Sequence, residues 1–163
     1  MSEIDVYRNL EYRVRAVATV RNSRPEPTDD SWEGVRSRIV LEPHVPVSSL
    51  AGLESFSHVE VIYLFHQQSK DDVIMGAEHP RENVVWPKVG IFAQRKKSRP
   101  NRLGLATARI ERVDLTERTL HVSRLDAINE TPVLDIKPVM REFLASGEMR
   151  QPDWSHELMR DYW

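Results

Sequence analysis

Short segments with a two-residue hydrophobic period limit the fold of this chain more than any other feature of its sequence. In residues 12–20, Tyr12 and Val14 alternate with Arg13 and Arg15, which predicts a half-buried β-strand. Further candidate strands, rich in β-branched or aromatic residues, span 36–42, 58–67, 89–95, 103–113, 119–126 and 131–137. The strand–helix–strand rhythm of a parallel sheet is missing, so we predict a mainly β fold, a single-sheet, mostly antiparallel β-barrel with short peripheral helices.

Only two short helices are expected beside this sheet. One falls near residues 48–56, and the other is opened by Asp153 as N-cap and runs over about 153–162. Two long irregular loops occupy residues 22–34 and 68–87, and loops of that length often carry function. The chain has 163 residues, of which 40% are hydrophobic, enough for one buried core. We predict a single domain with its core over about 10–140 and no additional C-terminal domain.

Several classes of protein are excluded by what the sequence lacks. The chain has no cysteine, which removes disulfides, cysteine nucleophiles and thiolate metal sites. Its six glycines fit neither the dinucleotide fingerprint nor a P-loop, and no serine lies in a nucleophile elbow. We therefore predict no metal. Charged residues interrupt residues 1–20, and no later apolar run has membrane-spanning length, which predicts a cytoplasmic protein without membrane contact.

A basic run is the strongest sign of a ligand. Between residues 95 and 102 the chain carries five cations with no acid among them: Arg95, Lys96, Lys97, Arg99 and Arg102. Pro100, Asn101 and Gly104 end the run and favour a shaped turn over a helix. Because the formal net charge of the whole chain is only −2, attraction to a polyanion must come from such a local patch. The alternative is a solvated loop that only keeps the chain soluble.

Two other segments hold candidate site residues. In the strand at 58–66, alternation places His58, Glu60 and His66 on one face. His66 lies at the strand end, where Phe65 could stack on an adenine ring, whereas His58 is interpreted as structural. In the second segment, 126–138, Thr131, Val133, Asp135 and Lys137 share a face, and Pro132 and Pro138 indicate an edge strand. Asp126 and Asp135 are candidate carboxylates here, although Asp135 and Lys137 could simply form an ion pair.

Three of these segments together resemble one known family. The runs FSHVEVIYLFH (56–66), VGIFAQRKKSRPNRLGL (89–105) and TPVLDIKP (131–138) resemble the YaeB/TrmO family, also called TsaA-like proteins, in order and spacing. The resemblance implies an S-adenosylmethionine-dependent methyltransferase built on a single-sheet β-barrel and usually dimeric. It also implies a tRNA partner, with N6-methylation of threonylcarbamoyladenosine beside the anticodon as the reaction.

The same resemblance implies roles for individual residues. Residues expected to bind the cofactor are Asp30, Trp32, Phe65, His66, Arg95, Leu105, Ser123, Arg124, Leu125 and Asp126. The proton that leaves the adenine amine could go to His66, Asp126 or Asp135, and the sequence does not choose among them. Residues expected to contact RNA are Lys96, Lys97, Arg99, Asn101 and Arg102.

Departures from the family pattern leave the methyl acceptor open. A proline of the family motif is replaced by Arg102, and the usual Asp-Gly before Thr-Pro-Val is replaced by Asn129 and Glu130. The alternatives are therefore a methyltransferase that acts on another substrate, or a non-catalytic barrel that binds RNA or a nucleotide.

Overall fold

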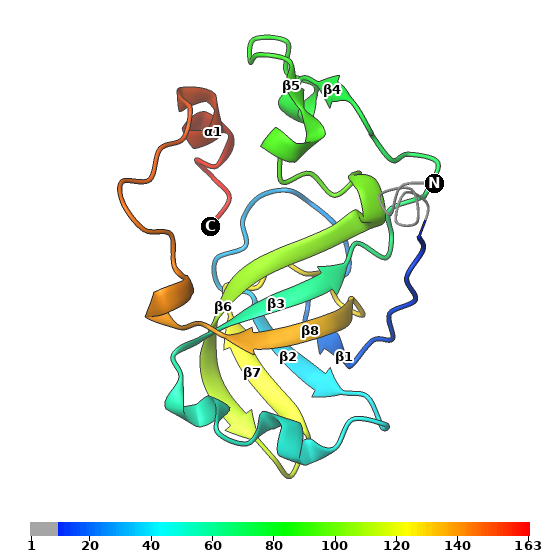
Figure 1. Ribbon diagram of the computed structural model, residues 1–163, viewed down its shortest axis with the longest axis vertical. Coiled ribbons are helices and arrows are strands. Elements are labelled where there is room, and N and C mark those ends of the chain that lie inside the picture. The colour runs from blue at the N-terminus through cyan, green and yellow to red at the C-terminus, as the bar shows by residue number, and fades with distance from the viewer. Residues whose placement is uncertain (1–9) are drawn as a thin grey trace, which may run out of the picture.

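A closed antiparallel β-barrel forms the body of the protein in the computed structural model, which describes residues 10–163 (Figure 1). Six strands close it in the order β1-β2-β7-β6-β3-β8, and every neighbouring pair is antiparallel. The strands are β1 (Ala18–Arg21), β2 (Arg36–Leu41), β3 (His58–Leu64), β6 (Leu103–Asp114), β7 (Thr119–Ser123) and β8 (Pro132–Pro138). This architecture confirms the predicted mainly β, single-sheet barrel.

The barrel interior is filled by every second residue of the strands. On β3, Val59, Val61 and Tyr63 are buried while His58 and Glu60 face outward, as the alternation predicts. Aliphatic side chains from the other strands meet them, among them Val20, Ile39, Leu120, Val122 and Val133. A barrel of this size holds a packed core and no channel, so a ligand must bind at one of its ends or on its outer wall.

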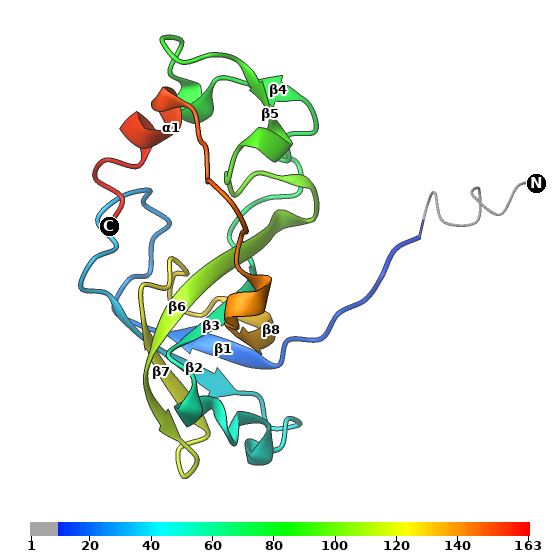
Figure 2. The same ribbon diagram turned by 60° about the vertical axis from the view of Figure 1, so that its left-hand side comes forward.

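Short elements gather at one end of the barrel. A two-stranded sheet of β4 (Ala77–Glu78) and β5 (Val89–Gly90) lies there beside the only α-helix in residues 10–163, α1 (Asp153–Leu158) (Figure 2). The turn between β6 and β7 projects from the opposite end (Figures 1 and 2). The 3-10 segments are Val47–Leu50, Leu53–Ser55, Pro80–Glu82, Ile91–Ala93, Pro100–Arg102 and Arg141–Phe143. Within the same described residues, no helix combines the length and apolar composition that crossing a membrane requires.

Some predicted boundaries are wrong, each for a local reason. The strand predicted over 12–20 begins only at Ala18, because the ladder to β2 and β8 begins there and Tyr12 and Val14 are exposed. The strand predicted over 89–95 stops at Gly90 and continues as a 3-10 turn. Instead of one helix over 48–56 there are two 3-10 turns, separated by Gly52 in the left-handed region at φ 92°.

The C-terminal helix and two strand ends also differ from expectation. Helix α1 ends at Leu158 rather than Tyr162, and its N-cap is Pro152, so Asp153 is the first helical residue. Strand β3 stops at Leu64 and β7 at Ser123, which leaves Phe65, His66 and residues 124–126 in the segments that follow these strands.

Strand β8 is an interior strand of the barrel, so its interpretation as an edge strand is wrong. It pairs with β1 and with β3, and Pro132 is tolerated because the hydrogen bonds beside it are donated by the N–H groups of Val17 and Val20, which bind the carbonyls of Val133 and Thr131. Tyr63 is paired with Val133 and Ile62 with Asp135, so the residue between them, Leu134, bulges. The bulge breaks the shared face that alternation predicts: Val133 is buried, whereas Asp135 and Lys137 are exposed.

Candidate functional site

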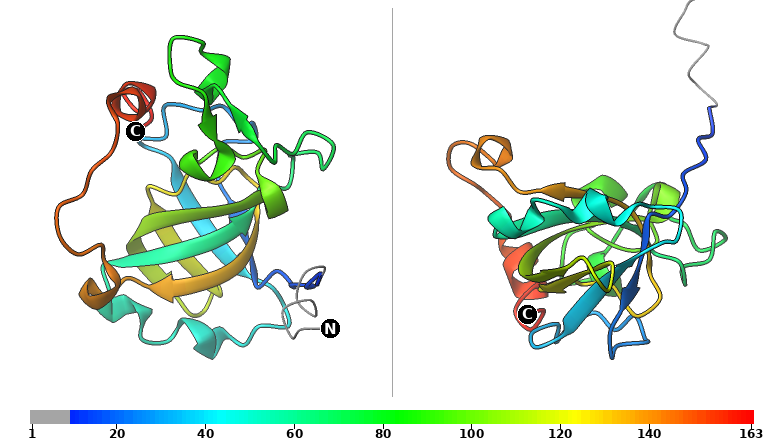
Figure 3. Two further views of the ribbon diagram at one scale, coloured as in Figure 1. Left: turned by 45° about the horizontal axis from the view of Figure 1, so that its top comes forward. Right: turned by 90° about the horizontal axis from the view of Figure 1, so that it is seen from below.

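β4, β5 and α1 gather at one end of the barrel (Figure 3, left). Residues of this end line a cavity of about 880 Å³. Its walls come from the residues that follow β3, from the loop 22–34, from the start of the basic run and from residues 126–131. A fifth wall is supplied by residues 151–163, which we call the C-terminal strap. The size and the many aromatic side chains of this cavity are typical of a small-molecule site.

The Asp126 carboxylate is held in this cavity by two tyrosine hydroxyls. The Tyr63 hydroxyl donates to Asp126 Oδ1 at 3.0 Å and to the Asp126 carbonyl at 3.2 Å. The Tyr162 hydroxyl donates to the other carboxylate oxygen, Oδ2. Burial, followed by the charge of Asp126, raises the pKa of both tyrosines above their usual value, so both keep their protons and remain donors. The carboxylate is therefore fixed in position before any ligand arrives.

The Tyr63 ring lies directly over Gly104. A Cβ atom on residue 104 would come within 2.3 Å of Tyr63 Cε2, far inside normal contact distance. Because Gly104 is the register partner of Tyr63, the ring crosses from β3 to β6 on the inner face of the barrel. The glycine that ends the basic turn is thus required by the tyrosine that holds Asp126.

His66 lines the cavity and is disposed to stay neutral. Burial lowers the pKa of its imidazole from the usual value of 6.5, and the charge of Glu130 opposes this only in part. The His66 Nδ1 atom lies 3.4 Å from Thr131 Oγ1, which orients the ring. The Phe65 ring packs edge-on against Tyr63, with ring centroids 5.4 Å apart, and also lines the cavity.

The basic run divides into two halves. Arg95, Lys96 and Lys97 line the cavity, where Lys96 pairs with Glu78 and Lys97 Nζ lies 3.5 Å from Asp29 Oδ1. The Arg95 guanidinium donates to the Leu105 carbonyl. These three side chains place positive charge on one wall of the cavity.

The second half of the run builds the turn itself. Arg99 Nη1 donates to the Gln94 carbonyl at 2.8 Å, and Arg102 Nη1 donates to the Gln68 carbonyl at 2.6 Å. Asn101 and Arg102 both adopt left-handed backbone conformations, with φ of 60° and 52°. None of these three residues lines the cavity.

In the first long loop, only one of the two expected residues reaches the cavity. Trp32 lines the cavity, and its Nε1–H donates to the Asp29 carbonyl at 3.1 Å. The Arg24 guanidinium carbon lies 3.7 Å from the centroid of the Trp32 ring. Asp30 does not line the cavity; its carboxylate instead binds Arg81, which does. Asp30 therefore positions a cation at the cavity edge.

Several expected site residues lie away from the cavity. Ser123 is buried and donates from Oγ to Glu111, Leu125 belongs to the barrel core, and the Arg124 guanidinium lies 4.2 Å from the Trp163 ring centroid. Of residues 123–126, only Asp126 reaches the cavity.

The outer wall holds the last two expected residues. Asp135 is exposed on β8, and its Oδ1 accepts from the Ile136 N–H at 2.9 Å. Leu105 is 46% exposed on the outer wall of β6. Neither side chain lines the cavity, although the Leu105 carbonyl is held by Arg95.

The C-terminal strap is the part of the site that sequence reasoning missed. Trp154, Leu158, Met159 and Tyr162 all line the cavity. The strap is anchored by the Ser31 and Trp32 N–H groups, which donate to the carbonyls of Asp161 and Tyr162 at 2.9 and 2.8 Å. Tyr63 was also missed as a site residue, because strand alternation marks it only as core. A cluster of aromatic residues in the last ten positions was the one signal available for the strap.

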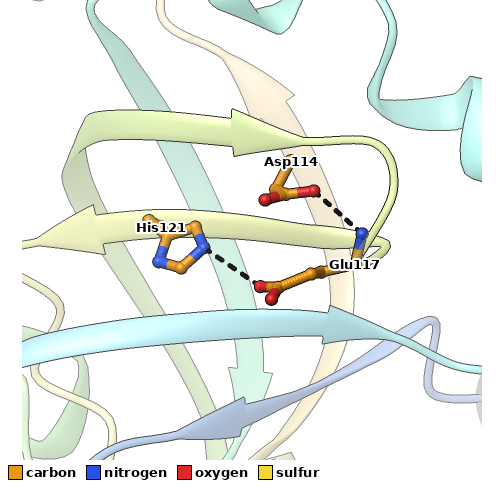
Figure 4. Close-up of side chains that lie close together, drawn as sticks. All are labelled: Asp114, Glu117 and His121. Atoms are coloured by element: carbon orange, nitrogen blue, oxygen red, sulfur yellow. Dashed lines mark hydrogen bonds and ion pairs between the residues drawn. The ribbon is translucent and has the colours of Figure 1, made fainter.

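A second polar cluster lies at the far end of the barrel. Asp114, Glu117 and His121 of the β6–β7 hairpin bring their potential ligand atoms within 4.8 Å of one another (Figure 4). Hydrogen bonds of the turn explain this grouping: the Glu117 N–H donates to Asp114 Oδ1 at 2.8 Å. Arg112 supplies the positive charge, since it donates to Asp114 at 2.5 Å and lies 2.9 Å from His121 Nε2. The cluster is thus accounted for as part of the hairpin.

Comparison with known proteins places this arrangement in a family. Residues 16–144 match the family model described as the tRNA-methyltransferase O N-terminal domain. A human protein named tRNA (adenine(37)-N6)-methyltransferase is 36% identical over 118 residues, which cover 72% of this chain and 25% of that protein. The chain thus spans about a quarter of the length of the mammalian relatives it matches.

A relative of similar length and a solved structure agree with this match. A probable S-adenosyl-L-methionine-binding protein of Methanothermobacter thermautotrophicus is 31% identical over 142 residues, covering 85% of this chain and 98% of that protein. A crystal structure of TrmO from Pseudomonas aeruginosa superposes with a TM-score of 0.71 at 27% identity, covering 91% of this chain and 63% of that one. The chain therefore belongs to the family of the tRNA-methyltransferase O N-terminal domain, as the resemblance to the YaeB/TrmO family implies.

Proposed function

We propose that this protein is an S-adenosylmethionine-dependent methyltransferase that methylates the N6 atom of threonylcarbamoyladenosine next to the anticodon of tRNA. The observation that carries the proposal is the Asp126 carboxylate, held by Tyr63 and Tyr162 in an aromatic cavity that also contains Arg95. The name of its relatives in human and Escherichia coli, tRNA (adenine(37)-N6)-methyltransferase, supports the substrate, and the name of a Pseudomonas aeruginosa relative, putative S-adenosylmethionine-dependent methyltransferase, supports the cofactor.

The residues of the cavity fit S-adenosylmethionine. The aromatic rings of Phe65, Trp32 and Trp154 could stack on the adenine ring. The Arg95 guanidinium could donate two parallel hydrogen bonds to the carboxylate of the amino-acid moiety. Asp126 would accept from the ribose hydroxyls or from the ammonium group, because it is an acceptor already fixed by two donors. When bound, this cofactor supplies an electrophilic methyl group.

The main tasks left to the protein are to orient the acceptor amine, to exclude water and to take up a proton. Of the three candidate proton acceptors, His66 is the one that we propose. Both oxygens of Asp126 already accept tyrosine hydroxyls, and Asp135 is exposed outside the cavity. With the Nδ1–H of His66 donating to Thr131 Oγ1, the Nε2 lone pair is left to receive the proton of the amine.

Lys96 and Lys97 are the cations that we propose for the RNA side of the site. Both line the cavity and both are only part-buried, so an RNA phosphate could replace Glu78 or Asp29 as their partner. Arg99, Asn101 and Arg102 would act on RNA indirectly, by holding the turn that presents these lysines. Such a substrate implies a cytoplasmic location.

The test combines cofactor binding with product analysis. Cofactor-stripped protein is titrated with S-adenosylmethionine by calorimetry and then incubated with tRNA and methyl-labelled cofactor, followed by nucleoside analysis. We expect saturable binding and label in methylated threonylcarbamoyladenosine, both weakened by Asp126→Asn. Absence of S-adenosylmethionine binding would refute the methyltransferase assignment. Binding with label in a different nucleoside would keep the methyltransferase assignment but refute threonylcarbamoyladenosine as the substrate.

We also propose that the protein forms a homodimer through the outer wall of β3 and β6. Ile62 is paired with Leu105 and Leu64 with Leu103 on that face, and both residues of β6 are more than 40% exposed. Adjacent apolar side chains on a sheet exterior are typical of an interface. Light scattering after size exclusion tests this, because Leu105→Glu should convert a dimer to a monomer.

A further inference from the structure

A second depression, of about 500 Å³, lies on the outer wall of the barrel across β1, β2 and β7. It is lined by three arginines, one histidine and two asparagines, and by no acid: Arg21, Arg36, Arg38, His121, Asn22 and Asn129. The residues belong to neighbouring strands and to the segments that follow β1 and precede β8. The depression is thus a concave surface with only cationic, neutral or donor-bearing side chains.

The placement of the arginines works against the stability of the sheet. Arg21 is the direct register partner of Arg38, and Arg38 is in turn the partner of His121. Like charges directly opposite one another destabilise a sheet. Within residues 10–163, Arg36 and Arg38 have no side-chain hydrogen bond or ion pair, and Arg21 has one, to Glu130 at 2.9 Å. A bound anion would relieve this repulsion.

The depression adjoins the cavity through a shared segment. Asn22 Nδ2 donates to the Ala127 carbonyl at 2.8 Å, and the Asn22 N–H donates to Asn129 Oδ1 at 3.1 Å. Ala127 and Ile128 line the cavity, while Asn129 lines the depression. Residues 127–129 therefore form the rim between the two.

We propose that this depression binds phosphate groups of the RNA whose adenine enters the cavity, with Arg36 and Arg38 as the principal contacts. Guanidinium groups match phosphate oxygens in a bidentate manner, and two of them at alternate positions of one strand follow a sugar–phosphate chain. A base that enters the cavity leaves its neighbouring phosphates at the rim. The identity of the anion as RNA rests on the proposed function, whereas the phosphate chemistry rests on the arginines alone.

The test compares two double variants of equal charge change. Arg36→Ala/Arg38→Ala removes the principal contacts, and Arg13→Ala/Arg15→Ala is the control, because residues 10–15 are exposed and run away from the barrel (Figure 2). Binding of tRNA is measured from 50 to 200 mM salt. The first variant should lose at least about tenfold in affinity and reduce the salt slope by about 1.4–1.8, for two lost phosphate contacts. The control should match the unmodified protein, and neither variant should change cofactor affinity.

Other outcomes would overturn the proposal. Unchanged tRNA affinity in Arg36→Ala/Arg38→Ala, or an equal loss in the control variant, would remove the depression as an RNA contact. A titration with inorganic phosphate distinguishes RNA phosphate from free phosphate as the ligand. Saturation at micromolar concentration, together with an unchanged tRNA affinity in Arg36→Ala/Arg38→Ala, would assign the depression to free phosphate instead. If tRNA binding depends on both arginines but no methyl group is transferred, this inference stands and the proposed function fails.

Discussion

Gly104→Ala should damage the site through a single misplaced methyl group. The new Cβ would lie 2.3 Å from Tyr63 Cε2 and 2.4 Å from Cζ, whereas carbon atoms in contact are about 3.5–4.0 Å apart. The ring must therefore move by about 1 Å or more. Tyr63 is only 2% exposed, with Phe65 against its edge and its hydroxyl on Asp126, so a displaced ring loses its packing against Phe65 or its hydrogen bond to Asp126.

The expected cost follows from two contributions. Overpacking of a filled core costs about 1–3 kcal/mol. Loss of the Tyr63–Asp126 hydrogen bond adds about 1 kcal/mol. A total of about 2–4 kcal/mol corresponds to a fall in Tm of roughly 5–15 °C for a chain of this size. Cofactor affinity should fall as well, because the Asp126 carboxylate is then held by Tyr162 alone.

Calorimetric or denaturant unfolding measures the effect, and the chain supplies its own control. Gly90 has φ −62° and nothing within 4 Å of an added Cβ, so Gly90→Ala should change stability by less than about 0.5 kcal/mol. A double-mutant cycle with Tyr63→Leu, which replaces the ring by a shorter aliphatic side chain, should recover at least about 1 kcal/mol of the Gly104→Ala loss. An equal loss with and without Tyr63, or a Gly104→Ala protein as stable as Gly90→Ala, would refute the steric reasoning.

Three further predictions test the roles assigned to individual residues. Tyr162→Phe removes one hydroxyl from Asp126 and should weaken cofactor binding about 5- to 30-fold, measured by calorimetry, with little change in barrel unfolding. Methylation should be constant from about pH 7 to 8 and should fall only below the usual histidine value of 6.5, because the lowered pKa keeps His66 neutral until then; a decline that begins above pH 7 would contradict this role. Asp135→Asn should leave the methylation rate unchanged, since its side chain is exposed on β8, and a large loss would return Asp135 to the site.

The fold was predictable where the sequence pattern is local. On β3 the alternation alone separates the buried Val59 and Val61 from the outward His58, although the strand predicted over 58–67 ends at Leu64. Periodicity within one strand does not predict a feature that depends on how two strands are paired. The bulge at Leu134 arises from the register between β8 and β3, which no periodicity within β8 encodes, and it exposes Asp135 instead of directing it inward.

The candidate site likewise contains residues that the sequence identifies and residues that it does not. Phe65, His66 and Arg95 lie in segments that carry their own motif, so sequence reasoning finds them, and all three line the cavity. Tyr162 reaches Asp126 from 36 residues away along the chain, through a strap that has no strand or motif of its own. The role of Gly104 was equally hidden, because the contact that requires a glycine is made by Tyr63, across the sheet.

The C-terminal strap gives the protein a spectroscopic property. All four tryptophans of the chain stand around the cavity or its strap: Trp32 and Trp154 line the wall, Trp86 donates from Nε1 to Glu157 of α1, and Trp163 lies under Arg124. The barrel core contains none of them. Intrinsic tryptophan emission therefore follows ligand binding and strap docking at one end of the molecule, while unfolding of the barrel has to be observed through its backbone.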